Sequence, residues 1–347
     1  MAAVDKVLLA SKFRGTLVGA LLGDCLGAPY EDVASISKRQ LQTYFDKMES
    51  TQVKGPFKPY TDDSAMTRCI AKSLIENKVV NETDIATKFV TEFYKEPNRG
   101  YGANVISVFD KLLSTKVSDP FGPALQQFNG SGSYGNGAAM RTSPIALFYF
   151  DNFSTLTSMC ANVSKITHAH KLGINGAILQ SLAIRKCLFL NPNEKLDVNR
   201  FATELIDEIK NVEKEEDKFN LSKYNYETQL TLMKNFFSKE SPPSDEEVVT
   251  KLGNSVSSIF SVPTAIYCFL RAQERIPKID TDNPFRRAIQ YAISLGGDTD
   301  TIASMTGAIA GAFFGDEIIN ENLKKECEKM NEAIDLADQL FKLKNII

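Results

Sequence analysis

Histidine and tryptophan are the scarcest residue types of this 347-residue chain, which has two histidines, His168 and His170, and no tryptophan. Metallohydrolase sites built on imidazole need several histidine ligands, so two histidines exclude that class. A serine triad would depend on one of these two residues, and the sequence has no GxSxG motif to hold the nucleophile.

Paired cysteines and long apolar runs are also missing. The six cysteines are scattered without CxxC spacing, which is typical of reduced, buried thiols in an intracellular protein. The longest nearly apolar stretch, residues 302–314, is too short to cross a bilayer. The first residues lack the apolar core and the cleavage site of a secretory signal. A weakly amphipathic targeting segment is the alternative there, but Asp5 favours an ordinary first helix.

Neither sign of charge is in large excess. The chain has 40 Lys and Arg residues against 43 Asp and Glu residues, and the pI is 5.7. This balance gives no support to duplex-DNA binding or to polybasic membrane binding. The hydrophobic content of 43% is enough for a sizeable core. Because no composition shift and no fixed-period repeat divides the chain, we predict a single domain over residues 1–347.

The spacing of apolar residues predicts helices through most of the chain. Stripes at three- and four-residue intervals occur in residues 13–26, 66–75, 177–184, 259–269 and 323–343. There is no series of alternating β-branched runs, so a substantial sheet is not expected. The charged residues 208–218 are expected on a solvated helix face. We predict an all-α fold, a compact multi-helix domain with long functional loops.

Two acidic motifs stand just ahead of helical stripes. They are Thr61-Asp62-Asp63, before a stripe that starts at Ser64, and Asp298-Thr299-Asp300-Thr301, before the stretch 302–314. Each motif alone fits a helix N-cap, but one carboxylate would suffice for capping. Four converging carboxylates would repel one another unless cations lie between them. Oxygen ligands without Cys or His favour Mg²⁺ over Ca²⁺ and Mn²⁺, and two ions could share carboxylates.

A glycine-rich loop covers residues 132–137 and leads into an apolar pattern at Ala138. Successive free backbone N–H groups in such a loop can bind phosphate oxygens, although a plain turn has the same composition. Phe128 and Tyr134 flank the loop, and their rings could stack on a purine or ribose or simply pack against the loop.

Three more polar positions have both a structural and a functional interpretation. Asp24 closes the first helix, where its carboxylate could bond backbone amides. Glu31 follows Pro29 in a predicted loop, where a carboxylate is free to reach a substrate. His168 and His170 would diverge on a helix, which argues against a shared metal, and His168 fits either a ligand contact or a buried structural role.

Four motifs together resemble the ADP-ribosylglycohydrolase family. GDCLGAPYE, YTDDSAM, GSYGNGAAMR and LGGDTDTIA occur in the order of that family, and the likeness covers nearly the whole chain. The segments VPTAIYCFLR and THAHKLGINGAILQ are similar to the vertebrate branch of the family that acts on ADP-ribosylserine. The resemblance implies a compact all-α fold, two Mg²⁺ ions and hydrolysis of the O-glycosidic bond between ADP-ribose and protein serine. It also implies degradation of poly(ADP-ribose) and O-acetyl-ADP-ribose.

The same resemblance implies roles for individual residues. Glu31 matches a mobile catalytic glutamate. The positions that match metal ligands are Thr61, Asp62, Asp63, Asp298, Asp300 and Thr301. The positions that match contacts to ADP-ribose are Gly100, Phe128, Ser133, Tyr134, Gly135, Asn136 and His168. The implied partners are ADP-ribosylated proteins, poly(ADP-ribose) and ADP-ribose, without duplex DNA or membrane. We expect a monomer in the cytoplasm and nucleus, with the mitochondrial matrix as a further compartment.

Other functions remain open at the level of sequence. An ADP-ribosylarginine hydrolase would have the same fold and differ in the leaving group. A diphosphate lyase or prenyl synthase also places paired Asp motifs around Mg²⁺, but the segment 62–66 lacks the final Asp of DDxxD. A catalytically inactive relative could bind ADP-ribose without turnover. The intact acidic motifs argue against that last alternative.

Overall fold

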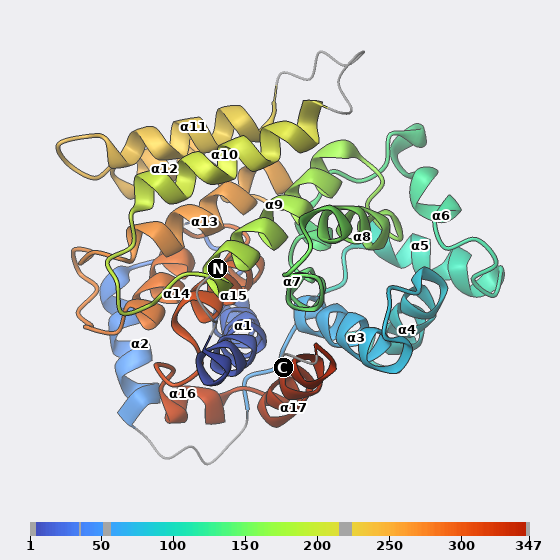
Figure 1. The fold of residues 1–347 in the computed structure, drawn as a ribbon, viewed down its shortest axis with the longest axis horizontal. Coiled ribbons are helices and arrows are strands. Elements are labelled where there is room, and N and C mark those ends of the chain that lie inside the picture. Colours follow the sequence, from blue (N-terminus) through green and yellow to red (C-terminus); the bar gives the residue numbers. More distant parts are fainter. Residues whose placement is uncertain (1–4, 35, 51–56, 215–223, 345–347) are drawn as a thin grey trace.

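Helices form the framework of the protein (Figure 1). The computed structural model describes residues 5–34, 36–50, 57–214 and 224–344. Within these ranges the only β pairing consists of isolated bridges. The predicted all-α fold class is therefore confirmed.

The α-helices are α1 Lys6–Gly27, α2 Lys38–Ser50, α3 Asp62–Asn77, α4 Glu82–Lys95, α5 Ala103–Ser114, α6 Gly122–Leu125, α7 Ser143–Phe148, α8 Phe153–Lys165, α9 Lys171–Leu188, α10 Val198–Lys214, α11 Tyr226–Phe237, α12 Asp245–Lys251, α13 Val262–Arg271, α14 Pro284–Ser294, α15 Thr299–Phe314, α16 Glu321–Glu326 and α17 Met330–Leu343. Short 3₁₀ turns are η1 Ala28–Tyr30, η2 Gln127–Gly130, η3 Asn136–Ala138 and η4 Ser258–Phe260.

Helices α1 and α15 pack against each other at the centre of the core (Figure 1). Both are buried along nearly their whole length, so their sequences are apolar or small on every face. In α1 the contact is made by a glycine every fourth residue: Gly15, Gly19, Gly23 and Gly27. A Cβ atom at Gly19 would lie 2.1 Å from the carbonyl oxygen of Gly307, so the two backbones touch directly. This contact fixes the position of the α15 N-terminus relative to the end of α1.

We expect Gly307→Ala to destabilise the protein, although alanine is the better helix former. A Cβ at residue 307 would lie 2.1 Å from the carbonyl oxygen of Gly19, so α1 and α15 would have to separate. Overpacking of this kind costs about 1–3 kcal/mol and outweighs the propensity gain of about 1 kcal/mol. Chemical denaturation of the variant measures the change. Gly102→Ala is the control, because a Cβ there meets nothing within 4 Å; a Gly307→Ala protein as stable as the wild type would contradict the close contact.

Both acidic motifs lie inside the first turns of helices, which differs from the prediction. Helix α3 begins at Asp62 rather than at Ser64, and α15 begins at Thr299, well before residue 302. Thr61 and Asp298 are the N-cap residues. The carboxylates at both sites can therefore lie near unpaired backbone N–H groups at the positive end of a helix dipole.

The helical stripe of residues 323–343 is divided between two helices, α16 and α17, whereas the spacing predicted one continuous pattern. The break has a tertiary cause, because Lys58 forms backbone hydrogen bonds on both sides of it. Its N–H donates to Glu326 at 2.7 Å, and its carbonyl accepts from Glu328 at 3.0 Å. Lys329 then takes a left-handed conformation, with φ of 62°, at the start of α17.

The prediction of a solvated charged face over residues 208–218 holds only in part. The carboxylate of Glu208 is largely buried and pairs with Lys186 at 3.4 Å, so this residue faces α9. Residues 215–218 lie outside the described residues. All six cysteines are buried and free, as expected. Among the described helices, none has the length and apolar character required to span a bilayer.

Candidate active site

A pocket of about 250 Å³ opens where the first turns of α3 and α15 meet the glycine-rich loop. The structure brings most of the sequence-predicted site residues to its wall: Glu31, Asp62, Asp63, Gly100, Ser133, Gly135, Asn136, His168, Asp298, Asp300 and Thr301. Thr61, Phe128 and Tyr134 are outside this wall. Each of these three is the sequence neighbour of a wall residue, namely Asp62, Gln127 and Ser133, so all fourteen residues lie in the wall or next to it in sequence.

The first acidic motif is held in place by Asp24, which is fully buried in α1. Its carboxylate accepts the backbone N–H of Thr61 at 3.0 and 3.1 Å and that of Ser64 at 3.1 Å. The interpretation of Asp24 as a residue that bonds backbone amides is therefore confirmed. Burial raises the pKa of Asp24 to about 7, while the hydrogen bonds from Ser64 and Thr61 lower it and Asp300 raises it further.

The second motif follows a turn at Gly296 and Gly297, which have φ of 71° and 73°. This left-handed conformation favours glycine, and a Cβ at Gly297 would also lie 2.2 Å from the carbonyl oxygen of Asn254. The turn is paired with the segment that follows Glu31. The N–H of Gly297 donates to Val33 at 3.1 Å, and its carbonyl accepts from Asp32 at 3.0 Å. The positions of Glu31 and of the second motif are therefore linked.

Side chains of the two motifs meet across the pocket. The hydroxyl of Thr301 donates to Oδ2 of Asp63 at 3.2 Å, which joins α15 to α3. On the other side, Nδ2 of Asn136 donates to Oδ2 of Asp298 at 2.5 Å. Carboxylate oxygens of Glu31, Asp298 and Asp300 all lie within 4.8 Å of one another. The convergence expected from the two motifs is present, and Glu31 shares it.

This concentration of buried negative charge shifts the pKa values upward. Burial, and after it the Asp300 carboxylate, raises the pKa of Asp62 and of Asp63 well above the ordinary value. Burial and the neighbouring Asp298 raise the pKa of Asp300 to about 7. Burial, and after it the carboxylates of Asp300, Asp32 and Asp24, raise the pKa of Glu31 to about 7. A cluster of this kind is disfavoured at neutral pH unless protons or cations offset its charge.

The donor set fits a hard divalent cation. It consists of carboxylate and hydroxyl oxygens, with no thiol and one buried imidazole in the wall. Oδ1 of Asp63 is buried and has no hydrogen-bond partner among the described residues. A buried carboxylate oxygen without a donor is costly, and a cation would satisfy it. Such oxygen-only ligands are those that Mg²⁺ prefers.

The glycine-rich loop packs against the two histidines. Gly132 has φ of 74°, and a Cβ there would lie 2.6 Å from the backbone nitrogen of His170. A Cβ at Gly137 would lie 2.8 Å from Cε1 of His168. The loop also pairs with the segment 256–258, because Asn136 donates to Val256 at 2.9 Å. The absence of side chains is thus required for the close contact between the loop and His168.

His168 is buried in the pocket wall and is a neutral imidazole. Burial, and then the positive charge of Arg141, lowers its pKa to about 3. Its Nδ1 is hydrogen-bonded to the hydroxyl of Thr167 at 2.8 Å. His170 is instead the N-cap of α9, where Nδ1 accepts the N–H of Leu172 at 3.1 Å. The two histidines therefore have different roles, and neither belongs to the acidic cluster.

The side chain of Arg141 hydrogen-bonds to the glycine-rich loop, and the sequence did not predict this role. Its guanidinium is fully buried and donates to the carbonyl of Gly137 and to the hydroxyl of Thr167, both at 2.8 Å. It thereby links the glycine-rich loop to the residue that orients His168. Arg141 ends the motif GSYGNGAAMR, but its position there does not reveal the hydrogen bond to Thr167, which lies 26 positions away.

Phe128 and Tyr134 lie at the surface with 46% and 50% of their area exposed. Their ring centroids are 6.2 Å apart, and the rings are inclined by 35°. Phe128 has φ of 50°, a conformation that aromatic residues rarely adopt. The Tyr134 ring also contacts His170, with centroids 5.9 Å apart, so loop packing covers part of the pair and leaves the rest open to a planar group.

The sequence also missed several wall residues. Gly102, Asn104, Gln127, Met140 and Val256 line the same pocket. Among them, Oε1 of Gln127 is buried without a hydrogen-bond partner among the described residues. These are isolated residues in loops and helix starts, and nothing in their spacing distinguishes them.

Comparison with known proteins gives consistent results. Residues 5–345 match the family described as ADP-ribosylglycohydrolase. The chain is 40% identical to "ADP-ribosylhydrolase ARH3" of Gallus gallus over 96% of this chain and 93% of the relative. It is 39% identical to the Homo sapiens protein of the same name, with the same two coverages. An uncharacterized protein of Escherichia coli, YegU, is 26% identical over 92% of this chain and 93% of its own length.

A solved structure has the same fold. The protein titled "ADP-ribosylglycohydrolase-related protein complex" superposes with a TM-score of 0.63 over 97% of this chain and 99% of that chain, at 18% identity. At that identity the likeness bears on the fold alone. The match over residues 5–345 and the relatives at about 40% identity show the family and not only the fold. This chain belongs to the ADP-ribosylglycohydrolase family.

Proposed function

We propose that the protein is a Mg²⁺-dependent hydrolase that cleaves the O-glycosidic bond between ADP-ribose and serine in modified proteins. By the same reaction it would degrade poly(ADP-ribose) and O-acetyl-ADP-ribose. The observation that carries the proposal is that an acidic cluster and a glycine-rich loop line one pocket. A cation site beside a phosphate site suits a substrate with a ribose joined to a diphosphate. The similarity to the proteins named ARH3 supports the same substrate class.

Two Mg²⁺ ions would be held by Thr61, Asp62, Asp63, Asp298, Asp300 and Thr301. Bound there, they would supply positive charge that orients the ribose hydroxyls or a water molecule at the anomeric carbon. The unpartnered Oδ1 of Asp63 and the raised pKa values of this cluster support that assignment.

Glu31 is the residue we assign to proton transfer. Glycosidic cleavage passes through a state with positive charge on the sugar ring, and the leaving oxygen needs a proton. Burial and Asp300 raise the pKa of Glu31 to about 7, close to the value that suits a general acid or base at neutral pH. The carboxyl lies at the rim of the acidic cluster, where it can reach the serine oxygen or the attacking water.

The rest of the pocket would hold the ADP-ribose. Backbone N–H groups of residues 132–137 and the hydroxyl of Ser133 can donate to the diphosphate. The neutral imidazole of His168 can make a hydrogen bond without adding charge. Gly100 has φ of 84° and lies beside Asp62, which keeps the approach to the metal site free of a side chain. Phe128 and Tyr134 would stack on the adenine.

A comparison of two substrates tests the proposal. A peptide that carries serine-linked ADP-ribose should release ADP-ribose in the presence of Mg²⁺ and should not do so with EDTA. An arginine-linked peptide should react much more slowly, because its N-glycosidic leaving group is different. Preferential release from arginine would favour the alternative hydrolase, and binding of ADP-ribose without any turnover would favour an inactive relative.

Two variants probe how the pocket binds ADP-ribose. We expect Gly135→Val to weaken binding, because a side chain there would lie 3.3 Å from Nε2 of His168 and would close the approach to the backbone. We expect Phe128→Ala to cost about 1–3 kcal/mol of binding free energy, by analogy with base–aromatic stacking. Calorimetry with ADP-ribose measures both effects. If both variants bind ADP-ribose with unchanged affinity, the glycine-rich loop is a plain turn and not a binding element.

The organisation of the whole protein is also part of the proposal. A single domain over residues 1–347, a monomer and a location in the cytoplasm and nucleus or the mitochondrial matrix all fit an enzyme that acts on modified proteins. Limited proteolysis, gel filtration and cell fractionation test these three points separately.

A further inference from the structure

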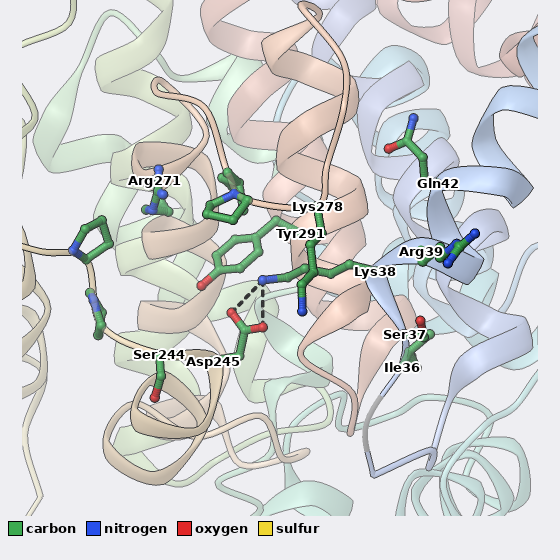
Figure 2. A pocket seen from close by; sticks show the side chains of 14 residues that line it. Ile36, Ser37, Lys38, Arg39, Gln42, Ser244, Asp245, Arg271, Lys278 and Tyr291 are labelled. Atoms are coloured by element: carbon green, nitrogen blue, oxygen red, sulfur yellow. Dashed lines mark hydrogen bonds and ion pairs between the residues drawn. The ribbon is translucent and has the colours of Figure 1, made fainter.

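A second, larger pocket lies away from the acidic cluster, and Figure 2 shows the side chains that line it. Its wall is formed by the start of α2, the residues around the start of α12, the chain that follows α13, and Tyr291 of α14. It has a volume of about 990 Å³, at the upper end of the about 300–1,000 Å³ typical of small-molecule sites. It shares none of its described lining residues with the candidate active site. We refer to it as the α2–α13 pocket.

The wall of the α2–α13 pocket has an excess of positive charge. It contains four cations, Lys38, Arg39, Arg271 and Lys278, and one carboxylate, that of Asp245. Nζ of Lys38 lies 2.6 Å from Oδ2 of Asp245 and 5.0 Å from the centre of the Tyr291 ring (Figure 2). The carboxylate of Asp245 is therefore paired with Lys38. Among the described residues the other three have no acidic partner within ion-pair distance.

Arg271 is the most informative of these cations, because only 8% of its area is exposed. Its NH2 group donates to the carbonyl of Arg275 at 3.0 Å, and no carboxylate of the described chain pairs with it. Its charge acts on the neighbouring Arg287, whose pKa is lowered mainly by burial and further by Arg271 and Arg275, against the effect of Asp282. A buried guanidinium needs several acceptors: Arg287 has two backbone carbonyls, whereas Arg271 has one among the described residues. The remaining donors of Arg271 can therefore bind a ligand that supplies negative charge.

Apart from Ser37, Gln42 and Ser244, the remaining residues of the described wall are apolar or aromatic. Ile36, Ile276, Pro242 and Pro243 contribute aliphatic walls, and Tyr291 presents a buried ring. Phosphate groups suit Arg and Lys side chains, whereas a flat hydrophobic group suits proline and tyrosine faces. The wall thus combines the two kinds of contact that an organic phosphate needs.

We propose that the α2–α13 pocket is a second binding site, which takes a small organic phosphate that carries a planar or apolar group. Arg271 binds the phosphate at the wall, Lys278 binds it from the rim, and the apolar walls hold the organic part. Arg39 lies on the opposite side of the pocket from Arg271 and attracts the phosphate at longer range (Figure 2). Asp245 opposes the phosphate and restrains Lys38. The site is independent of the proposed hydrolase activity, since it rests on different residues.

Phenyl phosphate is a suitable probe, because it has the charge and the ring but neither adenine nor ribose. Calorimetry on the full chain should give a Kd of about 1 mM or tighter. Inorganic phosphate should bind more weakly, and uncharged benzyl alcohol should not bind measurably. Saturating ADP-ribose should leave the affinity unchanged, which separates this site from the candidate active site. Displacement by ADP-ribose, equal binding of benzyl alcohol, or no binding of phenyl phosphate would each overturn the proposal.

Substitutions that remove positive or negative charge from the wall test whether phenyl phosphate binds in this pocket. Lys278→Asn and Arg39→Gln should each weaken phenyl phosphate by about two- to fivefold, as expected for exposed cations. Arg271→Gln should weaken it by about tenfold or more. Asp245→Asn should strengthen it, because the only carboxylate of the described wall loses its charge and Lys38 is released.

Lys78→Asn is the matched control for Lys278→Asn. Both lysines are exposed and have left-handed backbones, with φ of 59° and 67°, and Lys78 lies outside the pocket. Lys78→Asn should not change the affinity for phenyl phosphate. If a thermal melt shows that Arg271→Gln does not fold, the affinities of Lys278→Asn, Arg39→Gln and Asp245→Asn still decide whether phenyl phosphate binds in this pocket. Equal affinity in the wild type, Lys278→Asn, Arg39→Gln and Asp245→Asn would reject the site.

Discussion

Asp300→Asn should remove most of the hydrolase activity and weaken Mg²⁺ binding while the helical fold remains intact. The substitution keeps the size of the side chain and removes one negative charge from a buried cluster. Asp300 is 4% exposed, and its Oδ1 accepts the N–H of Thr301 at 2.8 Å, a bond that an asparagine oxygen can keep. We expect the same result for Asp62→Asn on the opposite helix. Mg²⁺-dependent release of ADP-ribose and calorimetric Mg²⁺ titration measure the two losses.

Although Asp300→Asn should lose activity, it should be more stable than the wild type in the absence of metal. Burial and Asp298 raise the pKa of Asp300 to about 7, so the folded protein disfavours the ionised form. At a pH above that pKa the charge lowers the free energy of unfolding, and the amide removes this cost. In EDTA at pH 8, Asp300→Asn should therefore unfold at a higher denaturant concentration than the wild type. With Mg²⁺ the wild type should gain stability and the variant should gain less.

Asp280→Asn provides the control, because Asp280 is exposed and lies outside the pocket. It should leave activity, Mg²⁺ binding and stability unchanged. Near-normal turnover of both Asp62→Asn and Asp300→Asn at low Mg²⁺ would contradict the two-metal assignment. A metal-free Asp300→Asn protein that is less stable than the wild type would show that the carboxylate has a structural bond that asparagine cannot replace.

The place of each acidic motif at the start of a helix could be predicted because its cause is local. Each motif precedes a helical stripe, and each begins a helix in the structure, with Thr61 and Asp298 as N-caps. The mutual distance could not be derived from either motif. It depends on the glycine contacts between α1 and α15, of which the sequence shows only small residues at helical spacing. The position of Glu31 relative to Asp298 likewise depends on backbone pairing between residues 32–33 and Gly297.

The parts of the site that escaped prediction are those fixed by long-range hydrogen bonds. Arg141 reaches Thr167, 26 positions away, through a buried guanidinium. The break between α16 and α17 is caused by Lys58, almost the whole chain away. The excess charge of the α2–α13 pocket comes from cations at residues 38–39, 271 and 278. Local spacing rules carry no information on such pairings, so only the three-dimensional structure reveals them.

Glu31→Gln should slow hydrolysis of serine-linked ADP-ribose by about 10²–10⁴-fold, the usual contribution of general acid–base catalysis. The amide has the same shape as the carboxyl but cannot give or take the proton. Because Glu31 belongs to neither acidic motif, ADP-ribose and Mg²⁺ should still bind. Single-turnover kinetics measure the rate, and calorimetry measures the two affinities.

Asp32→Asn is the matched control for Glu31→Gln, since Asp32 is the adjacent exposed carboxylate and its φ of 62° is tolerated by asparagine. Asp32→Asn should hydrolyse the substrate at nearly the normal rate, with the pH dependence set by Glu31 moved slightly lower, because the charge of Asp32 also raises the pKa of Glu31. A loss of about tenfold or less in Glu31→Gln would reduce Glu31 to a positioning residue, because proton transfer contributes more. Loss of Mg²⁺ binding together with activity would make Glu31 a metal ligand. That outcome is the sharper test, because carboxylate oxygens of Glu31, Asp298 and Asp300 lie within 4.8 Å of one another.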